Sequence, residues 1–328
     1  MLPVGCHFLA VGCKPSPGGR SPVKKHQDTG GATREGALGG VGMERLATHL
    51  TWVNLLAWLA VTSPLAAEEP PRRPVEGIMD NSFLIEEAYN QEAGVVQHIF
   101  NGVYGVDKVF GPVQHALDLS FTQEWPVFTQ THQFSYTVPY SFTWDGSRSA
   151  RGPGDVLLNY RYQAYLNERT LAAFAPRFSL VLPTGDDDQG FGSGVLGYQW
   201  SLPFSVALGD RWFVHANAGL TYLPSVGSAR VDLVDYNLGA SAIFCVSARL
   251  NLMLEWVGNW RQELDTGGTP HREVSSVISP GVRYAFNFRR ESQLVLGLGF
   301  PIGVTDAAPD LGAFLYLSFE HKLPGRKK

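Results

Sequence analysis

The sequence predicts an all-β fold, a single antiparallel transmembrane β-barrel of about twelve strands. Three observations lead to this prediction. Large apolar residues recur at every second position, which is the period of a strand. The alternating runs are about a dozen residues long, roughly twice the usual length of a soluble strand and enough to cross a membrane. Long polar connections alternate with tight turns, as they do in barrels of the bacterial outer membrane.

The clearest hairpin lies at residues 195–224. Its first arm alternates Tyr198, Trp200 and Phe204 with small or polar residues, and its second arm repeats this pattern from Trp212 onward. In a membrane barrel the apolar face contacts lipid and the small, polar face lines the lumen. The alternative is a soluble β-sandwich whose aromatic residues form an ordinary core.

The N-terminal part of the chain divides by composition. Residues 1–42 are rich in Gly, Pro and Ser, and we expect them to be disordered or to precede the true translation start. Residues 43–67 have the layout of a secretory signal peptide, with a positive charge, an apolar run and small residues before Glu68. Cleavage is therefore expected near Ala67, with the mature protein in the outer membrane of a Gram-negative bacterium.

Residues 68–94 are expected to form a short periplasmic segment before the barrel. Asn81 or Ser82 is a suitable cap for a short helix that runs through Ala93, and Gly94 is a suitable residue to end it. The sequence thus predicts one helical element outside the barrel.

A family resemblance begins in this segment. Residues 81–92 read NSFLIEEAYNQE and residues 94–98 read GVVQH. Together with LSFT at 119–122 and LPTG at 182–185, they resemble outer-membrane proteins grouped under the name MetA-pathway of phenol degradation. The resemblance implies a β-barrel in the outer membrane and a role in transport. It carries no catalytic residue onto this chain.

The barrel is expected at residues 95–323, followed by a basic tail at 324–328. The predicted strands have boundaries uncertain by two to four residues and lie at about 95–104, 115–126, 131–144, 155–166, 171–183, 195–208, 212–224, 234–247, 250–264, 274–287, 292–304 and 311–321. Long polar loops are expected at 145–154, 185–194, 225–233 and 265–273. An even strand count with both termini in the periplasm places these loops outside the cell.

The final predicted strand carries a further signal. Asp310, Gly312, Leu315 and Leu317 resemble the terminal pattern by which the barrel-assembly machinery recognises its clients. The chain departs from that pattern because it continues to Lys328 instead of ending on an aromatic residue. We therefore expect the assembly machinery as a partner during biogenesis.

Composition excludes several classes of function. The formal net charge of −4 indicates no nucleic-acid partner. The three cysteines predict neither a disulfide framework nor a metal site. The acidic run that starts at Asp186 lacks the Gly and Glu of a calcium loop, because Phe191 and Gly197 occupy those places. We expect no cofactor and no metal, and interpret the run as a solvated loop near lipopolysaccharide and outer-membrane lipid.

Enzymatic activity is not expected. The sequence contains no nucleophile elbow of the Gly-x-Ser-x-Gly type. His115, His132 and His215 have no catalytic partners that the sequence alone can place, so each is interpreted as a lumen or interface residue.

The polar lumen is the predicted functional region. The inward charges given by the alternation are Asp118, Glu124, Arg161, Arg177, Glu255, Arg261, Glu263, Arg283 and Glu320. Such charges either select solutes or pair with each other and fill the lumen. The sequence favours a channel for passive uptake of small molecules, with aromatic or hydrophobic compounds as candidate cargo. The alternative is a structural or adhesion barrel with a closed lumen.

Overall fold

The computed structural model describes residue 78 and residues 82–108, 113–265, 267–288 and 292–323. The predicted disordered start at 1–42, the signal peptide at 43–67 and the basic tail at 324–328 lie outside the described residues. No helix in the described part of the chain is long and apolar enough to cross a membrane.

Strand segments account for most of the described chain. In sequence order they are β1 (Val95–Asp107), β2 (Gln114–Val127), β3 (Thr129–Trp144), β4 (Ser149–Pro153), β5 (Val156–Tyr162), β6 (Tyr165–Asn167), β7 (Ala172–Phe174), β8 (Arg177–Leu182), β9 (Gly197–Ser201), β10 (Phe204–Leu208), β11 (Trp212–Val226), β12 (Val231–Ser247), β13 (Leu250–Leu264), β14 (Pro270–Phe288), β15 (Ser292–Gly299), β16 (Ile302–Gly303) and β17 (Leu311–Lys322).

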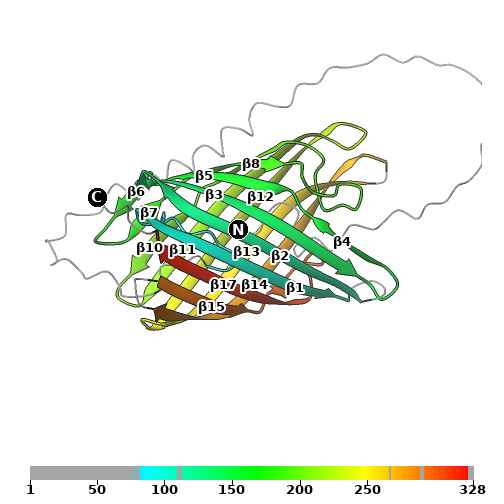
Figure 1. Ribbon diagram of the computed structural model, residues 1–328. Coiled ribbons are helices and arrows are strands. Elements are labelled where there is room, and N and C mark those ends of the chain that lie inside the picture. Colours follow the sequence, from blue (N-terminus) through cyan, green and yellow to red (C-terminus); the bar gives the residue numbers. More distant parts are fainter. Residues whose placement is uncertain (1–77, 79–81, 109–112, 266, 289–291, 324–328) are drawn as a thin grey trace, which may run out of the picture. The chain divides into compact units, whose positions relative to one another are not determined.

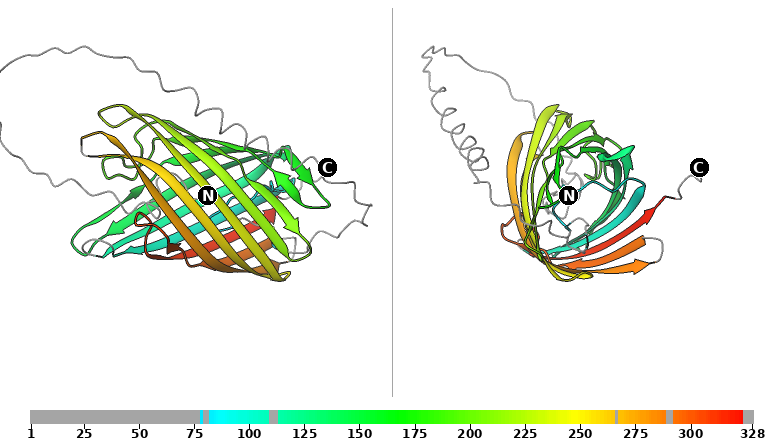
Figure 2. Two further views of the ribbon diagram at one scale, coloured as in Figure 1. Left: turned by 180° about the vertical axis from the view of Figure 1, so that it is seen from behind. Right: turned by 90° about the vertical axis from the view of Figure 1, so that its left-hand side faces the viewer.

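These segments form one closed antiparallel barrel of twelve spanning strands within the described residues. Each spanning strand pairs with the next one along the chain, and β17 returns to pair with β1, from Val95 opposite Lys322 to Val106 opposite Leu311. The ring is seen end-on in Figure 2 and from the side in Figure 1. Closure satisfies the backbone groups of both terminal strands, which a membrane requires. The predicted fold class and strand number are confirmed.

Four of the spanning strands, which the sequence predicts as uninterrupted, are divided into shorter segments in the structure. Breaks occur at Gly154, Pro176, Pro203 and Pro301, next to or at residues that donate no backbone N–H. The ladder continues across them, because Tyr162 N donates to Pro176 O and Ala175 N donates to Pro203 O. The barrel wall therefore stays hydrogen-bonded through the interruptions.

The outward face of the barrel is apolar. Leu252 and Leu254 on β13 are about half exposed, and Trp144 and Trp212 are exposed at opposite ends of the barrel. An apolar band flanked by aromatic residues is the surface that lipid tails and headgroups contact. The chain is therefore an outer-membrane protein, and the short turns mark its periplasmic end.

The connections at the external end are shorter than predicted, with one exception. β11 reaches Val226 and β12 starts at Val231, and Pro270 already pairs with Leu264. Cross-strand hydrogen bonds thus continue beyond the predicted strand ends and replace loop with hairpin. Residues 183–196 remain a long loop.

The predicted helix before the barrel is wrong for the described residues. Residues 82–94 contain bends and a turn but no helix. They lie inside the barrel, where ten consecutive residues from Ser82 to Gln91 are buried. Polar side chains of the barrel wall bond the backbone N–H groups of this segment, so that it does not depend on the internal hydrogen bonds of a helix.

A charge on the outward face is expected to destabilise the barrel. Leu254→Arg places a guanidinium among lipid tails, which costs about 2–4 kcal/mol near the middle of the membrane. The measurement is the denaturant midpoint of unfolding in lipid vesicles. Asp210→Arg, in the exposed turn after β10, is the control and should leave the midpoint unchanged. Equal midpoints for both variants would contradict the assignment of the lipid face.

Candidate functional site

The lumen is occupied by residues 82–94, which we call the lumenal segment. The segment enters at the periplasmic end, where it precedes β1 directly, and its contacts extend from Gln133 of β3 to Glu255 of β13 and Phe314 of β17. It contacts most of the circumference of the barrel. The geometry of these contacts defines the candidate functional site.

Glu86 is the electrostatic centre of the lumenal segment. Arg177 Nε donates to both carboxylate oxygens of Glu86, at 2.9 and 3.0 Å. Arg161 Nη1 lies 3.4 Å from Oε1, and Ser201 Oγ donates to Oε2 at 3.0 Å. Burial alone raises the pKa of this carboxyl group, but Arg177 and then Arg161 outweigh it and lower the pKa to about 2.

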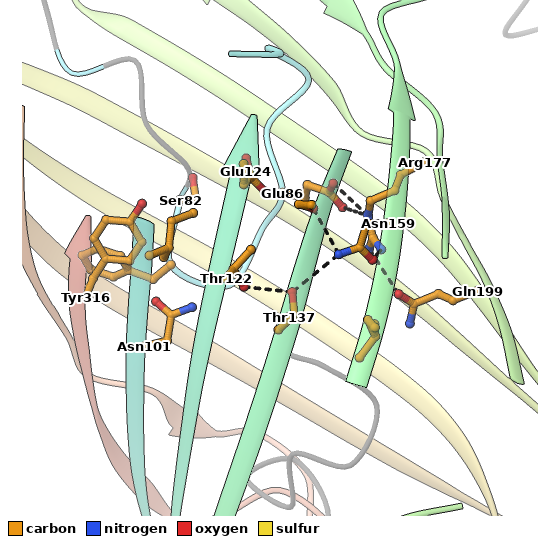
Figure 3. A pocket seen from close by; sticks show the side chains of 14 residues that line it. Ser82, Glu86, Asn101, Thr122, Glu124, Thr137, Asn159, Arg177, Gln199 and Tyr316 are labelled. Atoms are coloured by element: carbon orange, nitrogen blue, oxygen red, sulfur yellow. Dashed lines mark hydrogen bonds and ion pairs between the residues drawn. The ribbon is translucent and has the colours of Figure 1, made fainter. Parts of the chain in front are cut away.

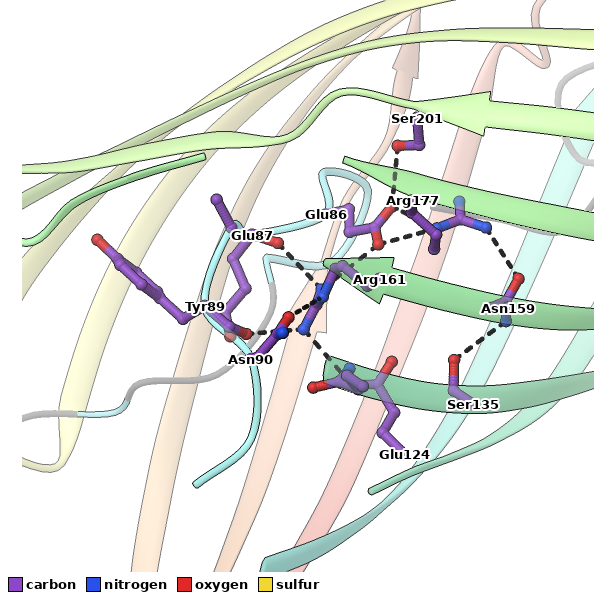
Figure 4. Close-up of polar contacts among 12 residues, drawn as sticks. Glu86, Glu87, Tyr89, Asn90, Glu124, Ser135, Asn159, Arg161, Arg177 and Ser201 are labelled. Atoms are coloured by element: carbon purple, nitrogen blue, oxygen red, sulfur yellow. Dashed lines mark hydrogen bonds and ion pairs between the residues drawn. The ribbon is translucent and has the colours of Figure 1, made fainter. Parts of the chain in front are cut away.

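Arg161 also holds the backbone of the lumenal segment. Its guanidinium donates to the carbonyl oxygens of Tyr89 at 2.7 Å and Glu87 at 3.1 Å. Its Nε donates to Asn90 Oδ1 at 2.8 Å (Figure 4). Glu124 on the wall lies 3.9 Å from the same guanidinium. One arginine thus connects the wall to Glu87, Tyr89 and Asn90 of the segment.

Backbone N–H groups of the lumenal segment are bonded by wall side chains. Glu255 Oε1 accepts from Leu84 N at 2.9 Å and from Ile85 N at 3.3 Å. Three more wall side chains accept one N–H each: Ser205 from Ala88, Gln163 from Asn90 and Gln133 from Gln91. The wall therefore supplies the acceptors that an extended chain lacks.

The apolar contact of the lumenal segment is made by Phe83. Its ring stacks on Phe314, with ring centroids 5.2 Å apart, and lies 5.4 Å from Tyr316. A Cβ added at Gly281 would approach the ring of Phe83 to 2.8 Å. Gly297 faces the same ring even more closely. The wall is therefore hollowed by glycines where Phe83 packs.

A small cavity lies against the lumenal segment (Figure 3). Its volume is about 60 Å³, and Ser82, Phe83 and Glu86 form part of its lining. The lining contains both polar and apolar side chains. The polar wall residues include Asn101, Thr122, Thr137, Asn159 and Gln199, and the apolar residues are Phe83, Ile99, Leu157 and Tyr316.

The polar lining of the cavity is organised by hydrogen bonds. Thr122 Oγ1 and Thr137 Oγ1 lie 2.9 Å apart, and Asn159 Nδ2 donates to Ser135 Oγ at 3.1 Å. Arg177 joins this network to Glu86 through Asn159 Oδ1, which accepts from its Nη1 at 2.9 Å (Figure 3). The arrangement offers hydroxyl and amide groups beside an aromatic surface.

His215 has a hydrogen-bonded serine that the sequence alone does not place. Ser205 Oγ accepts from Ala88 N at 2.8 Å and is hydrogen-bonded to His215 Nδ1 at 2.7 Å. Both side chains are buried beneath the lumenal segment, and Tyr89 packs edge-on against His215. The pair completes the contact between the wall and the backbone at Ala88.

The structure brings most of the nine predicted inward charges to the lumenal segment. Six of them are buried on the lumenal side: Asp118, Glu124, Arg161, Arg177, Glu255 and Arg283. Arg283 Nη2 donates to Ile78 O at 3.3 Å, and Gln91 Nε2 donates to Glu320 Oε1 at 3.4 Å. Asp118 instead accepts from Ser141 Oγ at 2.5 Å, nearer the external end.

Arg261 and Glu263 are separate from this group. They lie half-buried at the external end of β13, further along the strand than Glu255, which contacts the lumenal segment. Contact between these nine charged side chains and a solute remains a prediction.

The main residues that sequence reasoning missed are those of the lumenal segment. Glu86 and Asn90 make its polar contacts and Phe83 makes its apolar contact. On the wall, Gln163 accepts from Asn90 N and donates to Ala88 O. A paired acid at Glu86 and Glu87 within an apolar stretch is the signal that the sequence contains. Such a pair is also common on the solvated face of a short helix, so the pattern does not distinguish the two structures.

The comparison with protein families identifies the chain. The family model described as "Putative MetA-pathway of phenol degradation" matches residues 87–320. The chain belongs to this family. The matched range begins within the lumenal segment and ends in β17, so membership in the MetA-pathway of phenol degradation family covers the barrel and much of the site. The resemblance first detected at residues 81–98 is confirmed. No curated protein matches the chain.

The barrel fold of this MetA-pathway family member is similar to that of a solved outer membrane channel. The COG4313 outer membrane channel from Pseudomonas putida F1 matches with a TM-score of 0.57 and 16% identity, covering 72% of this chain and 98% of that one. The translocator domain of autotransporter NalP from Neisseria meningitidis matches with a TM-score of 0.46 and 10% identity, covering 71% and 90%. The TodX deltaS2S3 mutant monoaromatic hydrocarbon channel has a TM-score of 0.40 and 11% identity, covering 71% and 91%.

Removing the charge of Glu86 is expected to loosen the lumenal segment. Glu86→Gln leaves Arg177 and Arg161 without their shared carboxylate, and loss of one partner from a buried ion pair costs about 3–5 kcal/mol. Hydrogen exchange at the amides of Leu84, Ile85 and Ala88 should accelerate at least tenfold, while the strand amides stay protected.

Glu92→Gln is the matched control, because Glu92 lies in the same segment but is exposed. Its amides should exchange as in the wild type. Equal protection in both variants would show that Glu86 does not hold the segment.

The contact of Glu86 is expected to persist in mild acid. Its pKa lies near 2 instead of 4.5, so the ionised form is stabilised in the folded state. This contribution is fully present above the unfolded pKa and is lost as the pH falls through about 2. Exchange at Ala88 and Asn90, whose amides donate to the neutral side chains of Ser205 and Gln163, should stay constant from pH 8 to pH 5 after correction for its intrinsic pH dependence. Release of the segment near pH 5 would contradict this assignment.

Proposed function

We propose that this protein is an outer-membrane channel for passive uptake of small molecules, with aromatic or otherwise hydrophobic compounds as its cargo. The lumenal segment closes the periplasmic half of the channel. One observation carries this proposal: the lumen is filled mainly by a segment that is not part of the barrel ladder. Displacement of the segment opens a path without breaking a strand pair.

The charge pattern supports a removable closure. Arg177 and Arg161 pair with Glu86 on the segment, and Glu255 bonds the backbone of Leu84 and Ile85. In a permanently filled lumen the same wall charges would pair chiefly with each other. The rival proposal, a structural or adhesion barrel with a closed lumen, requires that the segment never moves.

The cavity beside the segment supports the choice of cargo. Phe83 and Tyr316 offer an aromatic surface, whereas Thr137 and Asn159 offer hydrogen bonds. A small aromatic ring with a hydroxyl group matches both kinds of lining. The TodX structure is titled a monoaromatic hydrocarbon channel, which agrees in class with this cargo.

The proposal includes no enzymatic step. Ser205 is hydrogen-bonded to His215, but its Oγ also accepts a hydrogen bond from Ala88 N of the lumenal segment. The segment therefore covers the hydroxyl group that would have to act as the nucleophile. Tyr89 packs against the imidazole from the other side. These contacts favour a structural role for both residues.

Biogenesis and partners complete the proposal. The chain is exported after cleavage near Ala67 and is inserted by the barrel-assembly machinery, which reads the motif around Gly312 in β17. Outer-membrane lipid and lipopolysaccharide surround the apolar face. No nucleic acid is expected to bind.

Conductance in planar bilayers tests the proposal. The chain starting near Glu68 is compared with a variant that lacks residues 82–91 and with Arg161→Ala and Arg177→Ala. The deletion should raise single-channel conductance several-fold, and each arginine variant should shift ion selectivity toward cations. Phenol added to the full-length chain should interrupt the current, whereas glucose should not.

Glu92→Gln serves as the control and should conduct like the wild type. If the folded deletion variant conducts no better than the full chain, the lumenal segment does not close a path. In that case the structural barrel with a closed lumen becomes the better interpretation.

A further inference from the structure

The external end of the β13–β14 hairpin carries an imidazole and two carboxylates on its inward face. Glu263 is the direct cross-strand partner of His271, and Glu273 lies two residues further along the same face of β14. One ligand atom from each side chain lies within 4.8 Å of the other two. We propose that Glu263, His271 and Glu273 bind a divalent transition-metal ion of the Zn²⁺ type.

The separations suit a small metal ion. His271 Nε2 lies 3.6 Å from Glu273 Oε1. Two ligands of a tetrahedral ion with bonds of about 2.0–2.2 Å lie about 3.3–3.6 Å apart. The pair therefore needs little movement to share one ion. A mixed imidazole and carboxylate set favours Zn²⁺ and its neighbours over Ca²⁺ or Mg²⁺, which prefer oxygen ligands alone.

The three side chains are held by a rigid element. The hairpin is paired continuously from Leu250 opposite Tyr284 to Leu264 opposite Pro270. At its tip Asp265 Oδ1 accepts from Thr269 N at 2.8 Å. In Figure 2 the hairpin is drawn in yellow to orange. Ligands on paired strands keep their spacing better than ligands on a loop.

The surrounding charge favours a cation. Glu263 and Glu273 share this face with Asp235 of β12, whose Oδ1 accepts from Gln262 N at 2.7 Å. Arg261 is the cross-strand partner of Glu273 and provides one compensating charge. Three carboxylates thus face one guanidinium and one imidazole, and a bound cation lowers their mutual repulsion.

A second observation lies one inward pair deeper in the lumen. Asn259 and Ser275 are cross-strand partners next to Arg261 and Glu273 on the same face. Asn259 Nδ2 and Ser275 Oγ are buried without a hydrogen-bond partner among the described residues, and Ser275 is only 3% exposed. A three-ligand metal site keeps an open position for water or another ligand. Asn259 Nδ2 is suited to donate a hydrogen bond to such a ligand, and Ser275 Oγ is suited to donate or accept one.

The site goes beyond the proposed function and does not depend on it. Nothing in the transport of small molecules requires a metal at the external mouth, and a metal can bind here whether the lumen is open or closed. The test therefore measures binding and not conductance.

Titration calorimetry with ZnCl₂ on the full chain, refolded in detergent, tests the site. One Zn²⁺ should bind per chain, and CaCl₂ should give no comparable binding. His271→Ala and Glu263→Gln should each weaken Zn²⁺ binding at least tenfold, because each removes one of three ligands. Heat-dependent gel mobility shows that each variant has folded, since the substitutions lie at an exposed hairpin end.

A second close pair of imidazoles provides the control. His98 Nε2 and His321 Nε2 lie 3.3 Å apart on the outward face of β1 and β17. The double variant His98→Ala/His321→Ala should bind Zn²⁺ like the wild type. The proposal is overturned if His271→Ala binds Zn²⁺ normally, if the double variant loses binding, or if Ca²⁺ binds more tightly than Zn²⁺.

Discussion

A membrane offers no hydrogen-bond partner to a backbone, and this constraint shapes the wall of the barrel. In the wall it requires closure, which the pairing of β1 with β17 supplies. It also explains why the breaks at Pro176 and Pro203 are bridged by hydrogen bonds from neighbouring strands. In the lumen the lumenal segment is buried by the wall, so its N–H groups also need protein partners and find their acceptors on wall side chains.

The second dependence is electrostatic. Arg161 and Arg177 are buried, and a buried guanidinium is stable only when it is paired and hydrogen-bonded. Glu86 provides the carboxylate that both share, while Glu124 lies at the edge of the group. The wall without the lumenal segment is therefore electrostatically incomplete, and the segment without the wall has no partners for its backbone. Each stabilises the other, which links closure of the lumen to the charges that line it.

Much of the barrel follows from the sequence because one physical rule decides it. Side chains alternate between lipid and lumen, so the apolar positions predict the strands and also predict that Arg161, Arg177 and Glu255 point inward. The lumenal segment has no such period. Its Ser82, paired acids and Gly94 fit a capped helix equally well, and only the wall acceptors decide against one. The proximity of Glu263 to His271 likewise depends on the register of the β13–β14 hairpin. Because His271 falls in the predicted loop at 265–273, the predicted strands do not pair these two residues.

The glycines opposite the lumenal segment connect two parts of the chain that are distant in sequence. Gly281, Gly297 and Gly299 leave the space that the ring of Phe83 fills, and Gly239 does the same for Ile85. A larger residue at one of these glycines forces a smaller one in the segment, and a smaller residue at Phe83 leaves a void against the wall. Wall and segment must therefore vary together during evolution. Relatives that have lost Phe83 are expected to carry bulkier residues at the matching wall positions.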